Sequence, residues 1–172
     1  MEMAPRRFFI CSLMVFTTVA GICAWRLLPA KNAGMLRCST KVIMHFENNT
    51  TKNINGKLHL DFGAGGKGSL MVEGYTDSAA GWLYLQRYVK FTYTTKKVSA
   101  SERDYRINSW EASASSIDQS PDVIFDYFMR EMSDSHDGLF LNARKLNNHA
   151  VLFSSVSSPL YICTLKPTSK FD

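Results

Sequence analysis

An apolar segment near the N-terminus constrains this chain more than any other feature. The segment Phe8–Leu28 reads FFICSLMVFTTVAGICAWRLL, and no charged residue or proline interrupts it before Arg26. A helix needs roughly 20 apolar residues to cross a bilayer, whereas the apolar part of a cleaved secretory signal is about 7–15 residues long. We therefore predict that residues 8–28 form a retained transmembrane anchor, with a cleaved signal as the alternative. Under either interpretation, the chain after about Pro29 is exported.

The orientation of this anchor follows from the residues on its two sides. Arg6 and Arg7 precede it against a single acid, Glu2, and basic residues in short flanking loops favour the cytoplasmic side. Long domains translocate largely regardless of their charge. We expect a cytoplasmic leader at residues 1–7, a tether at 29–36, an exported domain at 37–166 and a loose tail at 167–172.

The exported domain has the period of β-strands. From Arg37 to Glu47 apolar and polar residues alternate, and this alternation indicates a half-buried strand. Residues 57–62 repeat the pattern. Asn48-Asn49 and Asn55-Gly56 both favour turns, and the sequence leaves open which pair is the hairpin tip. Further strands are expected at residues 69–75, 82–98, 102–115, 139–144, 150–156 and 160–165.

One amphipathic helix interrupts these strands. Ser120 is a good N-cap, Pro121 suits the first helical position, and an apolar stripe at helical spacing follows up to Met132. Strands and helices do not alternate, which disfavours a parallel sheet, and a long antiparallel meander removes its exposed edges by closing. The predicted fold is mainly β: a transmembrane helix, then an antiparallel, roughly eight-stranded barrel with one helix between its fifth and sixth strands.

The four cysteines fall into two groups. Cys11 and Cys23 lie in the apolar segment and read as small hydrophobic residues, whereas Cys38 and Cys163 bracket the exported domain. An oxidising compartment makes a Cys38–Cys163 disulfide available. Such a bridge would join the first and last strands, which are neighbours only if the sheet closes. The alternative is two unrelated buried thiols.

The sequence does not group residues that would carry catalysis or bind a metal. The four histidines lack metal-ligand spacing, and the Gly-x-Ser-x-Gly motif is absent. Residues 63–68 are glycine-rich but lack the spacing of a phosphate-binding loop, so we expect a hairpin turn there. We expect no enzyme activity and no cofactor. The net charge of +5 is spread along the chain, which argues against direct nucleic-acid binding.

The layout resembles the FidL-like family of bacterial inner-membrane proteins. The resemblance rests on the single N-terminal anchor and on the segments CSTKVIMHFENN, NGKLHLDFGAGGKG and SPLYICTLKP. Such proteins are similar in organisation to ToxS and VtrC, small partners of membrane-bound winged-helix transcription activators. The resemblance implies a single-pass inner-membrane protein with a periplasmic, lipocalin-like barrel. It also implies a heterodimer with such an activator, in which the barrel helps to sense a small amphipathic ligand such as a bile salt.

Within that hypothesis, the inward-facing row of the barrel would line a ligand cavity. The candidate lining residues are Val42, Met44, Phe46, Leu58, Leu60, Phe62, Leu85, Arg87, Val89 and Phe91. The apolar members are equally what a packed core would contain. Arg87 indicates either a bulge or a snorkelling side chain, or else a cation that faces an anionic ligand. The alternative function is a stand-alone envelope ligand carrier or assembly factor without a regulatory partner, and an exported hydrolase is a more distant third.

Overall fold

The structure is a computed structural model that describes residues 14–21, 35–45, 51–79, 81–132, 138–156, 158–167 and 169. It divides into two units, Met1–Lys31 and Asn32–Asp172. In the first unit, residues 14–21 form an exposed helix. Among the described residues, no helix has the length and apolar character that crossing a membrane requires. The leader, the rest of the expected anchor, and most of the tether and tail lie outside the described residues.

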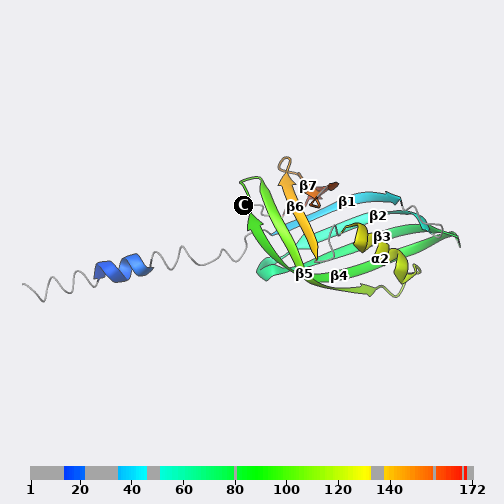
Figure 1. Cartoon of the computed structure of the whole chain (residues 1–172), viewed down its shortest axis with the longest axis horizontal. Coiled ribbons are helices and arrows are strands. Elements are labelled where there is room, and N and C mark those ends of the chain that lie inside the picture. The colour runs from blue at the N-terminus through cyan, green and yellow to red at the C-terminus, as the bar shows by residue number, and fades with distance from the viewer. Residues whose placement is uncertain are drawn as a thin grey trace, which may run out of the picture. The chain divides into compact units, whose positions relative to one another are not determined.

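The described part of the second unit is a closed antiparallel barrel (Figure 1). Each strand pairs with the next strand in sequence, and β1 pairs with β8 to close the sheet. The helix α2 (Asp122–Glu131) stands between β5 and β6, so the predicted eight-stranded barrel with a helix at this position is confirmed. The strands are β1 (Leu36–His45), β2 (Thr51–Phe62), β3 (Lys67–Ser78), β4 (Gly81–Lys97), β5 (Glu102–Ala114), β6 (Leu139–Lys145), β7 (Ala150–Ser154) and β8 (Pro159–Leu165), and the short 3-10 turn η1 (Ala64–Gly66) joins β2 to β3.

The Asn55-Gly56 pair, one of the two predicted turn signals, lies inside β2. Gly56 stands opposite Gly74 of β3, and the ladder continues through both residues. A Cβ atom on Gly74 would collide with the Asn55 carbonyl oxygen and would lie 2.5 Å from the Gly56 Cα atom. Glycine is therefore required here because two strand backbones approach too closely for a side chain, and not because the chain turns.

Aromatic rings fill the centre of the barrel. The ring of Phe62, which is fully buried, lies 4.0 Å from that of Tyr105 and 4.9 Å from that of Tyr93 between centroids. Phe91 and Phe153 complete the cluster at 5.4 and 6.2 Å. The five rings come from β2, β4, β5 and β7, so the middle of the barrel is a packed core.

A disulfide contributes to the closure of the barrel. It joins Cys38 of β1 to Cys163 of β8, with a sulfur–sulfur distance of 2.04 Å and a Cα–Cα distance of 5.6 Å. The ladder between these strands comprises the pairs Cys38–Leu165 and Ser39–Thr164. Just beyond it, the Lys166 N–H donates to the Arg37 carbonyl oxygen at 2.8 Å. A covalent bond therefore reinforces a short ladder.

Among the described residues, the barrel wall is complete at one end only. β6 pairs with β5 from Glu102 to Ile107, and β8 pairs with β1 at Cys38 and Ser39. Within the described structure, residues 108–114 of β5 and 40–45 of β1 therefore have a strand neighbour on one side only. We call the part with the start of β1 and the turns at residues 98–101 and 146–149 the closed end. The part with residues 115–121 and α2 is the open end.

Candidate functional site

Arg87 is the centre of a buried polar network at the open end. It projects from β4 into the barrel and is only 7% exposed. Its Nε donates to Asp118 Oδ2 at 3.0 Å, and its terminal nitrogens donate to Asp122 Oδ1 at 2.6 Å and to the Ser120 carbonyl oxygen at 2.9 Å. The β3–β4 ladder passes Arg87 without a register shift. The predicted bulge or snorkelling side chain at this position is therefore wrong, because the guanidinium is buried and is satisfied by the buried Asp118, the Ser120 carbonyl oxygen and Asp122.

Asp118 is the buried partner in this network. Its side chain is 2% exposed, whereas that of Asp122 is 86% exposed. Asp118 Oδ1 accepts hydrogen bonds from the backbone N–H and the hydroxyl of Ser120, both at 2.8 Å, and Oδ2 accepts one from the Gln86 N–H at 2.8 Å. The backbone of Pro121 is extended and makes this residue the N-cap of α2, so the predicted N-cap at Ser120 is wrong, and the Ser120 hydroxyl donates to Asp118 instead. The network holds residues 118–122, and with them the start of α2, against β4.

The electrostatics of the network keep Arg87 charged. Burial alone lowers the pKa of a guanidinium, but the hydrogen bonds from Arg87 to Asp122 and Asp118 outweigh burial, and the pKa of Arg87 is raised above its ordinary value. The side chain therefore remains a cation at every physiological pH. Its role in this arrangement is to bind carboxylates rather than to transfer protons.

The structure places the candidate lining residues in the core. Most of them are buried in one continuous hydrophobic cluster, Met44 packs against it partly buried, and Phe46 lies outside the described residues. The members of the cluster are Val42, Leu58, Leu60, Phe62, Leu85, Val89 and Phe91. Four of the residues that α2 buries, Ile124, Phe125, Phe128 and Met129, belong to the same cluster. The apolar face of α2 thus packs into the same core as the candidate lining residues.

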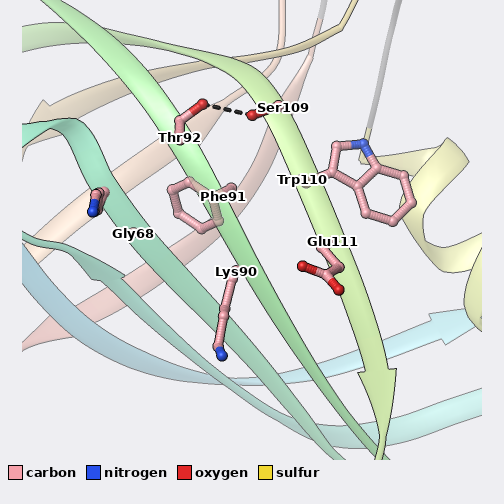
Figure 2. Close-up of a pocket in the computed structure, with 8 residues that line it drawn as sticks. Gly68, Lys90, Phe91, Thr92, Ser109, Trp110 and Glu111 are labelled. Atoms are coloured by element: carbon pink, nitrogen blue, oxygen red, sulfur yellow. Dashed lines mark hydrogen bonds between the residues drawn. The ribbon is translucent and has the colours of Figure 1, made fainter.

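Two shallow pockets lie on the barrel wall. The first, of about 410 Å³, lies over β3, β4 and β5 and is bordered by Lys90, Thr92 and Glu111 (Figure 2). The second, of about 340 Å³, is bordered by Arg37 and His59 on neighbouring strands. These polar side chains alternate with buried ones along each strand, so both pockets lie mainly on the outer face. Among the described residues, no three His, Cys, Asp or Glu side chains are grouped as a metal site requires.

The unpaired part of β5 is a feature that the sequence analysis missed. A register shift between β4 and β5 at Thr92/Tyr93 brings Trp110 opposite the buried Phe91, so the two share the inner face. Trp110 is nevertheless 49% exposed, because none of the described strands covers β5 beyond Ile107. Figure 2 shows its indole extending past β5 on the side away from β4. The sequence signal that could have indicated this unpaired edge was the helix predicted between the fifth and sixth strands. A helix at that position means that the chain after β5 does not return at once to pair with it.

Tyr161 and Tyr93 differ in how their buried hydroxyls are satisfied. The Tyr93 hydroxyl donates to the Gly63 carbonyl oxygen at 2.6 Å, whereas the Tyr161 hydroxyl has no hydrogen-bond partner among the described residues. Burial raises the pKa of Tyr161 above its ordinary value. An unsatisfied buried polar group costs about 1–3 kcal/mol.

We therefore expect Tyr161→Phe to raise the free energy of unfolding by about 1 kcal/mol and Tyr93→Phe to lower it by a similar amount. The measurement is equilibrium urea unfolding of the full chain in detergent at neutral pH. Because the folded state holds the Tyr161 proton more tightly than the unfolded chain, this tyrosine also costs stability as the pH rises above about 10, and that loss should be smaller in Tyr161→Phe. Equal destabilisation by both substitutions would contradict the conclusion that the Tyr161 hydroxyl is buried without a hydrogen-bond partner.

Comparison with protein-family models places the chain in a known group. The model described as FidL-like putative membrane protein matches residues 74–163, more than half of the sequence. The chain belongs to the FidL-like family. The matched region of this FidL-like protein runs from the middle of β3 to Cys163, so it includes the Arg87 network, α2 and the unpaired part of β5. A search of the curated proteins found no relative that matches the chain.

Proposed function

We propose that this FidL-like protein is a single-pass inner-membrane protein whose periplasmic barrel pairs with a membrane-bound winged-helix transcription activator. The observation that carries the proposal is the incomplete wall: residues 108–114 of β5 and 40–45 of β1 lack a strand neighbour on one side within the described structure. Unpaired strand edges present backbone donors and acceptors to another chain, and β-strand addition is a recurrent mode of protein recognition. The proposal assigns the protein a binding role without catalysis.

The unpaired edge of β5 has the composition of a binding surface. Natural proteins protect exposed edges with lysine, proline or covering elements, yet residues 108–114 contain neither lysine nor proline and carry one charge, Glu111. Trp110, a residue type common in interface hot spots, stands on this edge. Ile43 on the edge of β1 is 63% exposed. These features favour a protein partner over open solvent at this position.

The Arg87 network supports the ligand-sensing part of the proposal. The network holds the start of α2 against β4, and the helix buries its apolar face in the core that the candidate lining residues form. An amphipath with an anionic head and an apolar body would compete with Asp118 and Asp122 for Arg87 and with α2 for the core. Such a ligand would change signalling to the extent that it binds two states of the protein with different affinity, one with α2 packed against the core and one with α2 displaced from it.

Capture from membranes tests the pairing. The full-length chain, affinity-tagged and solubilised in mild detergent after in-cell crosslinking, should co-purify with a protein that combines a DNA-binding domain and one transmembrane helix. Trp110→Ala should reduce the captured amount about tenfold or more, the typical effect of removing an aromatic hot spot. The matched control is Trp82→Ala, because Trp82 is also exposed but lies beside the β3–β4 hairpin turn and not on residues 108–114 of β5 or 40–45 of β1.

The outcomes separate the two candidate functions. A chain that is isolated alone, with identical behaviour for wild type and Trp110→Ala, would contradict the pairing and favour the stand-alone envelope carrier. An equal loss for Trp82→Ala would show that the β5 edge is not the docking site.

A further inference from the structure

Four separate segments of the chain meet at the closed end of the barrel. The Lys145 N–H donates to the Ser101 carbonyl oxygen at 2.8 Å, which joins the β6–β7 turn to the β4–β5 turn. The Leu165 N–H donates to the His149 carbonyl oxygen at 2.8 Å, which joins the end of β8 to the β6–β7 turn. The start of β1 is bound next to them through Arg37 and Lys166. Residues 96–101, 144–149, Arg37 and Lys166 thus form one surface, which we call the turn surface.

Basic and exposed apolar side chains are combined on the turn surface. Its basic residues are Arg37, Lys96, Lys97, Arg144, Lys145 and Lys166. Three carboxylates of the described residues border it. Asp61 pairs with Arg37 at 2.7 Å, Glu102 pairs with Arg144 at 3.6 Å, and Asp104 stands opposite Lys96 in the ladder without a described ion pair between them. Val98 and Leu146, in the two turns, are 52% and 48% exposed. Positive charge therefore surrounds two apolar side chains that project from the fold.

The open end has the opposite charge. Its described residues include the acids Asp77, Asp118, Asp122, Asp126 and Glu131, which outnumber the basic residues Lys52, Arg87 and Arg130. The barrel is thus polarised, with its basic pole at the point where the chain enters β1. Lysine and arginine side chains near a membrane surface are attracted to anionic lipid, and apolar side chains among them insert into the interface.

The length of the tether limits the distance between this surface and the bilayer. β1 begins at Leu36, and the proposed anchor ends at Leu28. An extended chain of eight residues spans at most about 28 Å. An anchor in the bilayer therefore keeps the start of β1, and with it the turn surface, within reach of the headgroups.

We infer that the turn surface binds the anionic phospholipid headgroups of the membrane in which the chain is anchored. This inference rests on the anchor in the proposed function. Contact at the closed end directs the open end, with the unpaired edges of β1 and β5, away from the bilayer. In that orientation the edges stay accessible to the exported domain of a partner anchored in the same membrane.

Hydrogen–deuterium exchange of the full-length chain in nanodiscs tests the inference. Peptides that cover residues 96–101 and 144–149 should exchange at least about fivefold more slowly in phosphatidylglycerol than in phosphatidylcholine, the factor that one basic residue contributes at an anionic surface. High salt should remove the difference, because the attraction is screened. Peptides from the barrel core should exchange equally in both lipids, which controls for changes in folding.

A triple substitution and a matched control complete the experiment. Lys96→Gln/Lys97→Gln/Lys145→Gln should abolish the lipid dependence and leaves the Arg144–Glu102 pair in place. The control Lys41→Gln/Lys57→Gln/Lys90→Gln removes the same charge from exposed positions on the barrel wall. In this control the lipid dependence of exchange should remain. Equal exchange in the two lipids, or loss of the difference in both triple variants, would overturn the inference.

Alkaline carbonate extraction separates this inference from the proposed function. A chain that resists extraction but has no lipid dependence overturns the inference alone. A chain that carbonate extracts overturns the anchor, and with it both proposals.

Discussion

Removal of the Cys38–Cys163 disulfide is expected to lower the free energy of unfolding by about 4–5 kcal/mol. The bridge spans 125 positions and encloses almost the whole barrel, so without it the unfolded chain gains the conformational freedom of a long loop. The loss is close to the entire stability of many single domains. The measurement is urea unfolding of Cys38→Ser/Cys163→Ser in detergent, followed by tryptophan fluorescence and compared with the wild type at the same temperature.

The matched control for this experiment is Cys11→Ser/Cys23→Ser. These two thiols lie in the apolar segment 8–28, and their replacement should change the unfolding of the barrel by less than about 0.5 kcal/mol. A reducing agent should destabilise the wild type as much as the Cys38/Cys163 substitutions do. A wild-type protein whose unfolding midpoint is insensitive to reductant would contradict the bridge.

Arg87→Met is expected to destabilise the barrel by about 3–5 kcal/mol. The substitution leaves the carboxylate of Asp118, 2% exposed, without its cationic partner, and an unpaired buried charge carries a cost of this size. The exposed Asp122 should contribute little, since water solvates its carboxylate in the variant. The loss of its bonds to Arg87 should also loosen the start of α2, which faster hydrogen exchange at residues 118–125 would reveal.

A double-mutant cycle isolates the pair from the general effect of substitution. Asp118→Asn in the Arg87→Met background should recover stability and give a coupling energy of about 2 kcal/mol. Arg37→Met is the control, because its ion pair with Asp61 is half exposed and should contribute no more than about 1 kcal/mol. A similar loss in the Arg37 and Arg87 variants, or additive effects in the cycle, would contradict a buried network.

The strand pattern of the barrel could be predicted because it is encoded in neighbouring residues. Alternation from Arg37 to Glu47 identified the inward face of β1, on which Cys38 and Val42 are buried. The helix between the fifth and sixth strands was also predictable, because the period of apolar residues changes at Ser120-Pro121. Asn55-Gly56 was interpreted as a turn signal, but a glycine is equally suited to a tight turn and to a close contact between strands. Gly74, which decides between the two, lies 18 positions away from Gly56.

The candidate site was harder to predict, because its contacts join residues remote in sequence. Arg87 and Asp118 are 31 positions apart, and nothing in either local segment marks them as partners. The unpaired edge of β5 depends on where β6 begins to pair. The alternation of residues within β5 carries no information about where β6 begins or ends. An unpaired part of β5 therefore has the same sequence pattern as a part that is paired on both sides.

The sequence by itself determined the local elements: the apolar N-terminal segment, the alternating strands, the amphipathic helix and the two cysteines that bracket the barrel. Each of these depends on the period of side chains along a few consecutive residues. The tertiary structure alone decided which distant residues meet, since strand register and closure position them. Lys96, Lys97, Lys145 and Lys166, which are scattered along the chain, lie together on the turn surface, and acidic residues outnumber basic ones at the open end. Among the described residues, parts of β1 and β5 lack a strand neighbour on one side, because β8 pairs with β1 only at Cys38 and Ser39 and β6 pairs with β5 only as far as Ile107.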